Sequence, residues 1–125
     1  MAIKKILIVD DSLTARHFLL DVLTKGGYEV IAAENGEEAI VKAKAEMPDL
    51  ILMDVVMPGI NGFQATRAIT KDEATKHIPV LMLTRKDMET DRIWGIRQGA
   101  TEFLSKPIEA ATLLAKISAL SAATE

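Results

Sequence analysis

Residues 49–62, with the sequence Asp49-Leu-Ile-Leu-Met-Asp-Val-Val-Met-Pro-Gly-Ile-Asn-Gly62, decide the fold. Residues 50–53 form an apolar run that is too short for a helix and has a proline on either side, which is typical of a strand buried on both faces of a parallel sheet. The run stops at a single carboxylate, Asp54, and a loop of turn-forming residues follows. Ligands of open α/β sheets bind at the carboxyl ends of the strands, so Asp54 is a candidate functional residue. An aspartate that only caps a turn is the alternative that this stretch leaves open.

Short apolar runs alternate with helical patterns along the rest of the chain. Strands are expected at residues 4–9, 28–33, 50–53, 78–84 and 102–105. A helix is expected after each strand: one stopped by Gly26 and Gly27, one between Asn35 and Pro48, one over residues 62–69, one over residues 87–98, and one at the C-terminal end. Five such units fill the 125 residues, so we expect a single domain over residues 1–125, with a parallel sheet between helices and without an output domain.

Apolar residues at helical spacing predict which faces of these helices are buried. The first helix is expected to bury Ala15, Phe18, Leu19, Val22 and Leu23. The second helix is expected to bury Ala39, Ile40, Ala43 and Met47. The last helix is expected to bury Leu113, Leu114, Ile117 and Leu120. Asn35 is expected to cap the second helix, with Glu38 completing a capping box. Gly95 weakens the fourth helix by about 1 kcal/mol relative to alanine, which makes that helix a candidate moving part.

The composition excludes several classes of protein. Hydrophobic residues make up 49% and charged residues 26% of the chain, and no apolar run approaches the length of a membrane span. Asp10 and Asp11 end the first apolar run before a secretory signal could form, so we expect a cytoplasmic protein. A formal charge of −3 disfavours nucleic acid, and a monomer that binds a protein or small-molecule partner is expected.

Polar side chains follow four of the five expected strands. Asp10 and Asp11 follow the first strand, Asp54 the third, Thr84 closes the fourth and Lys106 follows the fifth. Parallel strands bring these positions to one edge, and a strand order of 2-1-3-4-5 would make the three carboxylates neighbours. Clustered carboxylates need a cation, and oxygen ligands suit Mg²⁺. The chain has no cysteine and no histidine at this edge, which argues against zinc.

This grouping suits the formation of an aspartyl phosphate. A metal held by Asp11, Asp54 and a loop carbonyl would leave one Asp54 oxygen free to attack phosphorus. Lys106 would neutralise charge on the phosphoryl oxygens, and the Thr84 hydroxyl would donate a hydrogen bond to one of them. Each residue alone has a commoner role, such as helix capping for Asp10 and Asp11, so the hypothesis depends on the whole group.

The residues of this group, and the chain as a whole, resemble the receiver domains of two-component response regulators. The resemblance implies a flavodoxin-like three-layer α/β sandwich with five parallel strands in the order 2-1-3-4-5. It implies that Asp54 accepts a phosphoryl group from a histidine kinase, and that Lys106 and Thr84 contact that group. Mg²⁺, for which Mn²⁺ can substitute, would be held by Asp10, Asp11, Asp54 and the backbone carbonyl of Val56. Such a domain is no enzyme beyond catalysing its own phosphorylation and dephosphorylation.

The resemblance also implies a conformational switch. Thr84 would move toward the phosphoryl group and Phe103 would turn inward, although a static core aromatic explains Phe103 equally well. A cis peptide bond is implied before Pro107. The face made by the fourth helix, the fifth strand and the fifth helix is expected to bind a downstream protein target.

Two residues leave open questions about partners. Arg85 stands where the family usually has a small residue, so it could crowd the phosphate, pair with it or shape the approach of a partner. Trp94 could contact a partner or pack inward. Residues 63–72 and 86–95 resemble the single-domain regulators of type IV pilus chemosensory systems, which predicts control of twitching motility. A flagellar chemotaxis regulator, a phosphate sink and a receiver that signals without phosphate remain alternatives.

Two other classes of protein would fit a similar fold. A small phosphatase or phosphotransferase with an aspartate nucleophile after the first strand would need an alternating acid spacing that residues 10–14 lack. A flavin-binding domain would need a Ser/Thr/Gly phosphate loop after the first strand, where this chain instead has two acids that repel phosphate. Turnover of a general phosphoester would indicate the phosphatase or phosphotransferase. A coloured purified protein would indicate the flavin-binding domain.

Overall fold

The structure, a computed structural model, describes residues 3–55, 57, 59–84 and 89–123. The strands are β1 (Lys5–Val9), β2 (Glu29–Ala33), β3 (Leu50–Asp54), β4 (Val80–Thr84) and β5 (Glu102–Ser105). The helices are α1 (Leu13–Lys25), α2 (Gly36–Glu46), α3 (Gly62–Lys71), α4 (Glu89–Arg97) and α5 (Ala110–Ala123). β4 begins two residues later than the sequence predicted, because Pro79 has no N–H group to donate to a neighbouring strand.

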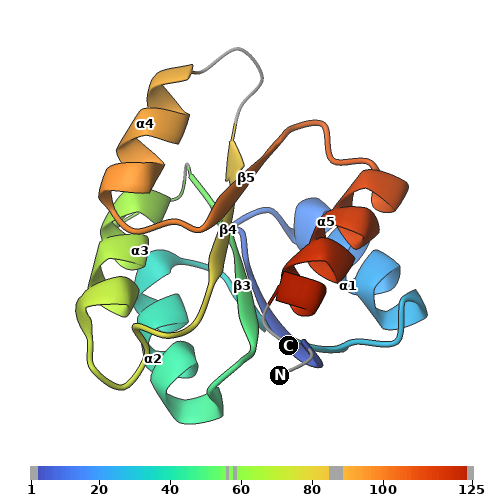
Figure 1. Cartoon of the computed structure of the whole chain (residues 1–125), viewed down its shortest axis with the longest axis horizontal. Coiled ribbons are helices and arrows are strands. Elements are labelled where there is room, and N and C mark those ends of the chain that lie inside the picture. Colours follow the sequence, from blue (N-terminus) through green and yellow to red (C-terminus); the bar gives the residue numbers. More distant parts are fainter. Residues whose placement is uncertain (1–2, 56, 58, 85–88, 124–125) are drawn as a thin grey trace.

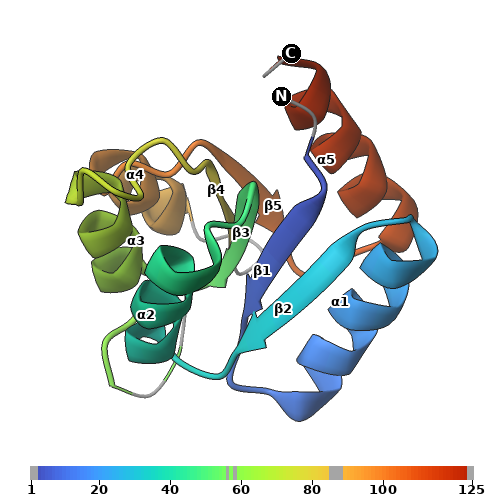
Figure 2. The same cartoon turned by 90° about the horizontal axis from the view of Figure 1, so that it is seen from below.

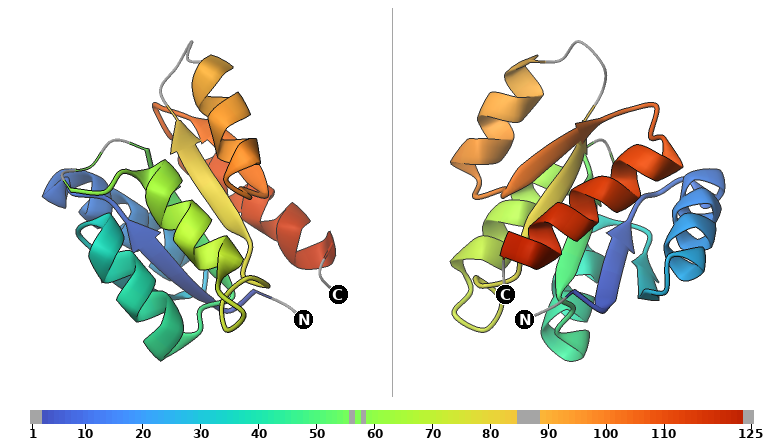
Figure 3. Two further views of the ribbon diagram at one scale, coloured as in Figure 1. Left: turned by 90° about the vertical axis from the view of Figure 1, so that its left-hand side faces the viewer. Right: turned by 45° about the vertical axis from the view of Figure 1, so that its right-hand side comes forward.

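The five strands form one parallel sheet in the order β2-β1-β3-β4-β5. Helices α1 and α5 cover one face of this sheet, and α2, α3 and α4 cover the other (Figure 1). Figure 3 shows both sets of helices from two further sides. The predicted three-layer sandwich and its strand order are therefore confirmed.

Each central strand contributes to two separate cores, since successive side chains point to opposite faces. In β3, Leu50 and Leu52 pack into the core beneath α1 and α5, whereas Ile51 and Met53 pack into the core beneath α2 and α3. All five residues of β3 and of β4 are buried. Fully burying one such aliphatic side chain contributes about 1.5–3 kcal/mol, so these two strands anchor the sheet.

The two ends of the described chain lie close together. The backbone N–H of Ile3 donates a hydrogen bond to the hydroxyl of Ser121 at 3.0 Å, which ties the start of the chain to α5 (Figure 2). Among the described helices, none has both the length and the apolar composition needed to cross a membrane.

Two residues that the helical pattern assigned to the core lie at the surface instead. Phe18 is 42% exposed, because it lines an open cavity between α1 and the loop after β5. Met47 is 43% exposed, because it ends α2 in the left-handed conformation, with φ of 48°, and so leaves the helical face.

The capping box was predicted in the wrong helix. Asn35 caps α2 by accepting from the N–H of Glu38, but the Glu38 carboxylate pairs with Lys42. A complete capping box is formed at the start of α3, where the side chains of Asn61 and Gln64 each accept from the other residue's N–H.

Candidate functional site

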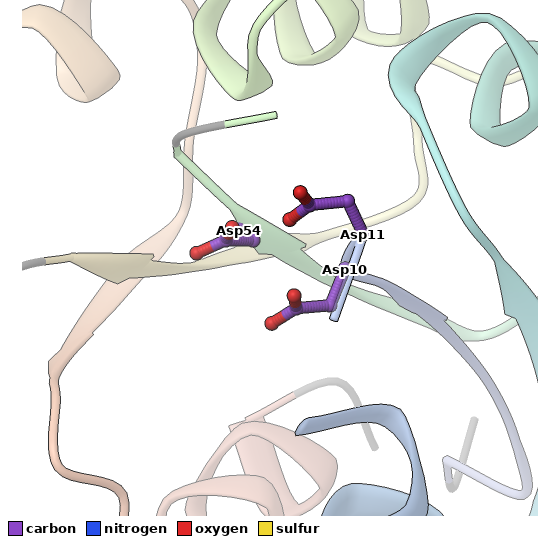
Figure 4. Close-up of side chains that lie close together, drawn as sticks. All are labelled: Asp10, Asp11 and Asp54. Atoms are coloured by element: carbon purple, nitrogen blue, oxygen red, sulfur yellow. The ribbon is translucent and has the colours of Figure 1, made fainter. Parts of the chain in front are cut away.

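Three carboxylates meet where β1 and β3 end side by side. Val9 pairs with Met53 in the sheet, so Asp10 and Asp54 occupy the next positions on adjacent strands. Oxygens of Asp10, Asp11 and Asp54 all lie within 4.8 Å of one another. Figure 4 shows the three carboxyl groups directed to the same side of this edge. They line an open cleft of about 440 Å³, which we call the acidic cleft.

Lys106 brings a positive charge into the acidic cleft from the end of β5. Its Nζ donates to Oδ1 of Asp54 at 2.6 Å and lies 3.6 Å from Oδ2 of Asp10. Its backbone N–H donates to the carbonyl of Thr84 at 2.7 Å, which ties Lys106 to the end of β4. The peptide bond between Lys106 and Pro107 is cis. The structure thus brings Lys106 together with all three carboxylates, while Thr84 closes the buried strand beside them.

Burial controls the electrostatics of the acidic cleft. Asp54 is 5% exposed, and its burial raises the pKa of the carboxyl. The hydrogen bond from Lys106 opposes this rise, while the charges of Asp10 and Asp11 add to it. Burial also disfavours the charged form of Lys106, but the hydrogen bond and charge of Asp54 outweigh it and raise the pKa of the ammonium. Lys106 therefore stays positive beside a surplus of negative charge.

Asp10 holds one carboxylate oxygen that no hydrogen bond satisfies. Oδ1 of Asp10 accepts from the N–H of Ser12 at 2.9 Å, whereas Oδ2 is buried and accepts no hydrogen bond from the described residues, with Nζ of Lys106 in an ion pair 3.6 Å away. Burying a carboxylate oxygen without a hydrogen bond is costly. Ser12 is the residue that caps α1, so neither Asp10 nor Asp11 is needed for capping.

These features fit a hard divalent cation. Such a cation would compensate the surplus charge and contact the Asp10 oxygen that accepts no hydrogen bond, and carboxylate oxygens are the ligands that Mg²⁺ prefers. Val56, whose carbonyl was expected to complete the ligand set, lies outside the described residues. Arg85, the expected neighbour of the phosphate, also lies outside them.

Glu37, in the first turn of α2, forms a hydrogen bond with the loop between β3 and α3. Its Oε1 accepts from the N–H of Ile60 at 3.1 Å, across 23 residues of sequence. Gly59 adopts a φ of 77°, and a Cβ placed there would lie 2.8 Å from Oε2 of Glu37. Sequence reasoning missed this contact, because an acidic residue in the first turn of a helix is already explained by the helix dipole.

Replacing Glu37 with alanine is expected to weaken Mg²⁺ binding about threefold, because the loop that follows Asp54 loses a charge-assisted hydrogen bond. Calorimetric titration of Mg²⁺ would measure the change. Glu37→Gln keeps the oxygen that accepts from Ile60, so it is expected to bind Mg²⁺ nearly as well as the natural chain. Equal losses in both variants would contradict the hydrogen bond and indicate a long-range effect of charge.

Phe103 connects the edge of the sheet to α4. Its ring is partly buried against the core beneath α2 and α3. A Cβ on Gly95 would lie 2.5 Å from Cε1 of Phe103 and 2.9 Å from Sδ of Met82, so α4 approaches the sheet through a glycine. The sequence suggested only that Gly95 weakens the helix; the structure shows that it permits this close packing.

Trp94 lies on the outer side of α4 and is 51% exposed. This answers the question that its sequence context left open, because the side chain does not pack into either core. Ile93 and Ile96 of the same helix are also largely exposed.

Comparison with known proteins agrees with this geometry. Residues 6–118 match the response regulator receiver domain family. The chain is 53% identical to Protein PilH of Pseudomonas aeruginosa over 116 residues, which cover 93% of this chain and 96% of PilH. A structure of the chemotaxis protein CheY4 of Vibrio cholerae superimposes with a TM-score of 0.87 at 38% identity, covering 93% of this chain and 97% of that one.

A further solved structure is relevant to the metal. The receiver domain of the sensor histidine kinase PA1611 from Pseudomonas aeruginosa, described with a magnesium ion coordinated in its active site cleft, superimposes with a TM-score of 0.85. It is 30% identical, and the match covers 93% of this chain and 95% of that domain.

Proposed function

Because this chain belongs to the response regulator receiver domain family, we propose that Asp54 is the residue that accepts a phosphoryl group from a histidine kinase. The observation that supports this choice best is the 2.6 Å contact between Asp54 and Lys106 inside the acidic cleft. The carboxylate is held at the carboxyl end of a buried strand, next to a cation that can neutralise an incoming phosphoryl group.

The transfer itself requires little of the protein beyond positioning and charge. An oxygen of Asp54 attacks phosphorus, the phosphorus–nitrogen bond of the donor histidine breaks, and its electron pair returns to the imidazole. Lys106 then balances charge on the phosphoryl oxygens, and the Thr84 hydroxyl donates to one of them. Asp10, Asp11, Asp54 and the carbonyl of Val56 would hold Mg²⁺. When bound, this ion supplies further neutralisation of the phosphoryl charge.

Incubating the protein with acetyl phosphate and Mg²⁺, followed by intact mass measurement, tests the proposal. We expect one acid-stable, base-labile phosphoryl group on the natural chain and none on Asp54→Asn. Asp21→Asn is the matched control, because Asp21 is an exposed aspartate of α1 whose described partner is Lys25. Phosphate retained by Asp54→Asn, or absent from the natural chain, would refute the role of Asp54. The same preparations should be colourless and should not turn over general phosphoesters, as expected for a signalling domain rather than an enzyme.

The pathway is proposed from the similarity to PilH, which extends over nearly the full length of both chains. Expressed in a Pseudomonas aeruginosa strain that lacks PilH, this chain is expected to restore normal twitching motility, and Asp54→Asn is not. The similarity to the chemotaxis protein CheY4 supports flagellar control as the second candidate. Failure to restore twitching by a chain that does accept phosphate would favour that second candidate.

A further inference from the structure

A groove between α3 and α4 lies apart from the acidic cleft. It measures about 360 Å³ and is lined by Asn61, Phe63, Gln64, Arg67, Trp94 and Gln98. Figure 1 shows the two helices that form its walls at the left of the molecule. We propose that this α3–α4 groove is a docking site for an acidic, amphipathic segment of a partner protein.

The groove offers an aromatic anchor. Trp94 is half exposed on the α4 wall, and the guanidinium of Arg97 stands 5.4 Å from the centre of its ring. This cation–π contact helps to hold the indole in place. Phe63, packed on the core beneath α3, supplies apolar surface on the opposite wall. Tryptophan and arginine are the residues that most often dominate binding energy at protein interfaces, so an apolar side chain of the partner has a preformed place here.

The charge of the groove selects an acidic partner. Arg67 and Arg97 are both exposed, and neither pairs with any carboxylate of the described residues. Arg67 instead donates from Nη1 to the amide oxygen of Gln98 at 3.4 Å. Two such cations on a protein of net charge −3 form a local basic site beside apolar surface. Carboxylates that flank an apolar side chain of the partner would complement both the charge and the apolar surface of that site.

The groove is also placed to respond to events at the edge of the sheet. Gly95, the neighbour of Trp94, packs directly against Phe103 of β5 and Met82 of β4. A shift of the Phe103 ring would therefore change how the α4 wall packs on the sheet. This response depends on the proposed phosphorylation, but recognition of the acidic segment does not.

The test uses Trp94 as its own reporter, because it is the only tryptophan of the chain. The probe is a synthetic helical peptide with leucine and phenylalanine on one face and glutamates beside them. Its matched control has glutamine at every glutamate position. We expect a saturable change of tryptophan emission with the glutamate peptide and about three- to tenfold weaker binding of the glutamine peptide, as two exposed charge pairs allow.

Variants of the protein locate the binding. The double variant Arg67→Gln and Arg97→Gln is expected to bind the glutamate peptide about three- to tenfold more weakly than the natural chain does. Lys25→Gln removes an exposed cation from α1, on the opposite side of the sheet, and should bind the glutamate peptide like the natural chain. Circular dichroism would establish that all variants remain folded.

Four results would overturn the docking proposal: no binding of the glutamate peptide, equal affinity for the two peptides, unchanged affinity in the double arginine variant, or tighter binding of a single-stranded oligonucleotide than of the glutamate peptide. Intact mass after treatment with acetyl phosphate separates this result from the proposed function. If the protein accepts phosphate but does not bind the peptide, only the docking proposal for the α3–α4 groove is refuted. If the protein binds the peptide but accepts no phosphate, only the proposed phosphorylation of Asp54 is refuted.

Discussion

Replacing Gly62 with alanine is expected to lower the free energy of unfolding by about 3 kcal/mol or more. Gly62 begins α3, and its N–H donates to the carbonyl of Val55 at 2.9 Å. A Cβ at this position would lie 2.1 Å from the backbone oxygen of Asp54 and 3.0 Å from Cα of Val55. Both obstacles are backbone, so no side chain can rotate away to relieve the clash.

The clash at Gly62 also predicts a loss of function. To admit the methyl group, either α3 or the end of β3 must move, and the second movement displaces Asp54. Urea denaturation would measure the stability, and intact mass after acetyl phosphate treatment would measure phosphate acceptance. We expect acceptance to fall even at temperatures where the variant remains folded.

Gly26→Ala is the matched control for this prediction. Gly26 caps α1 with a φ of −77°, and the nearest atom to a Cβ there is the end of the Leu114 side chain, at 2.9 Å. A flexible side chain can move aside, so a loss of about 1 kcal/mol is expected. Equal losses at Gly26 and Gly62 would show that the close approach of α3 to Asp54 is not the decisive factor.

Replacing Asp54 with asparagine is expected to stabilise the protein in buffer containing EDTA, by about 1 kcal/mol. This would raise the unfolding temperature by roughly 3–5 °C. Folding of the natural chain must bury the Asp54 carboxylate beside Asp10 and Asp11, whereas asparagine carries no charge. Its amide oxygen can still accept a hydrogen bond from Lys106.

The gain from Asp54→Asn should depend on pH in a definite direction. Burial raises the pKa of Asp54 above its ordinary value of 3.8, so the folded protein binds this proton more tightly than the unfolded chain does. Protonation of Asp54 therefore favours the folded state. This contribution to stability is fully present below the ordinary pKa of the unfolded chain and is lost as the pH rises through the raised pKa of the folded protein. The advantage of asparagine should therefore be largest near neutral pH and shrink as the pH falls toward 3.8.

Urea denaturation of both proteins, in EDTA and then in Mg²⁺, would test this explanation. Mg²⁺ should stabilise the natural chain more than the variant, because the stability that a ligand adds to the folded state grows with the logarithm of the ratio between its concentration and its Kd. Asp21→Asn should change the stability by no more than about 0.5 kcal/mol, since Asp21 is exposed. A gain from Asp54→Asn that is independent of both pH and Mg²⁺ would contradict an electrostatic origin.

Much of the architecture could be predicted from the sequence because it depends on local patterns. Residues 50–53 are uniformly apolar since β3 is buried on both faces, and the predicted bounds of β5 match the structure. The grouping of Asp10, Asp11, Asp54 and Lys106 followed from one topological fact, that parallel strands end at a common edge.

The features that the sequence did not reveal depend on contacts between distant residues. Glu37 and Ile60 are separated by 23 residues, and nothing in the composition of either segment indicates that they touch. Gly95 could be interpreted only by its cost to a helix, because its contact with Phe103 requires knowing how α4 lies on the sheet. Met47 left the buried face because the helix ended beneath it, and pattern reasoning is least reliable at such boundaries.

The division of the interior into two separate cores affects how such a protein can evolve. Among the described residues, the buried side chains beneath α1 and α5 form one cluster and those beneath α2 and α3 form another, with the sheet between them. A substitution in one cluster is therefore expected to disturb its own layer more than the other, although both layers are built on the same strands. We therefore expect the packing beneath one pair of helices to tolerate substitution with little change in the packing on the other side of the sheet.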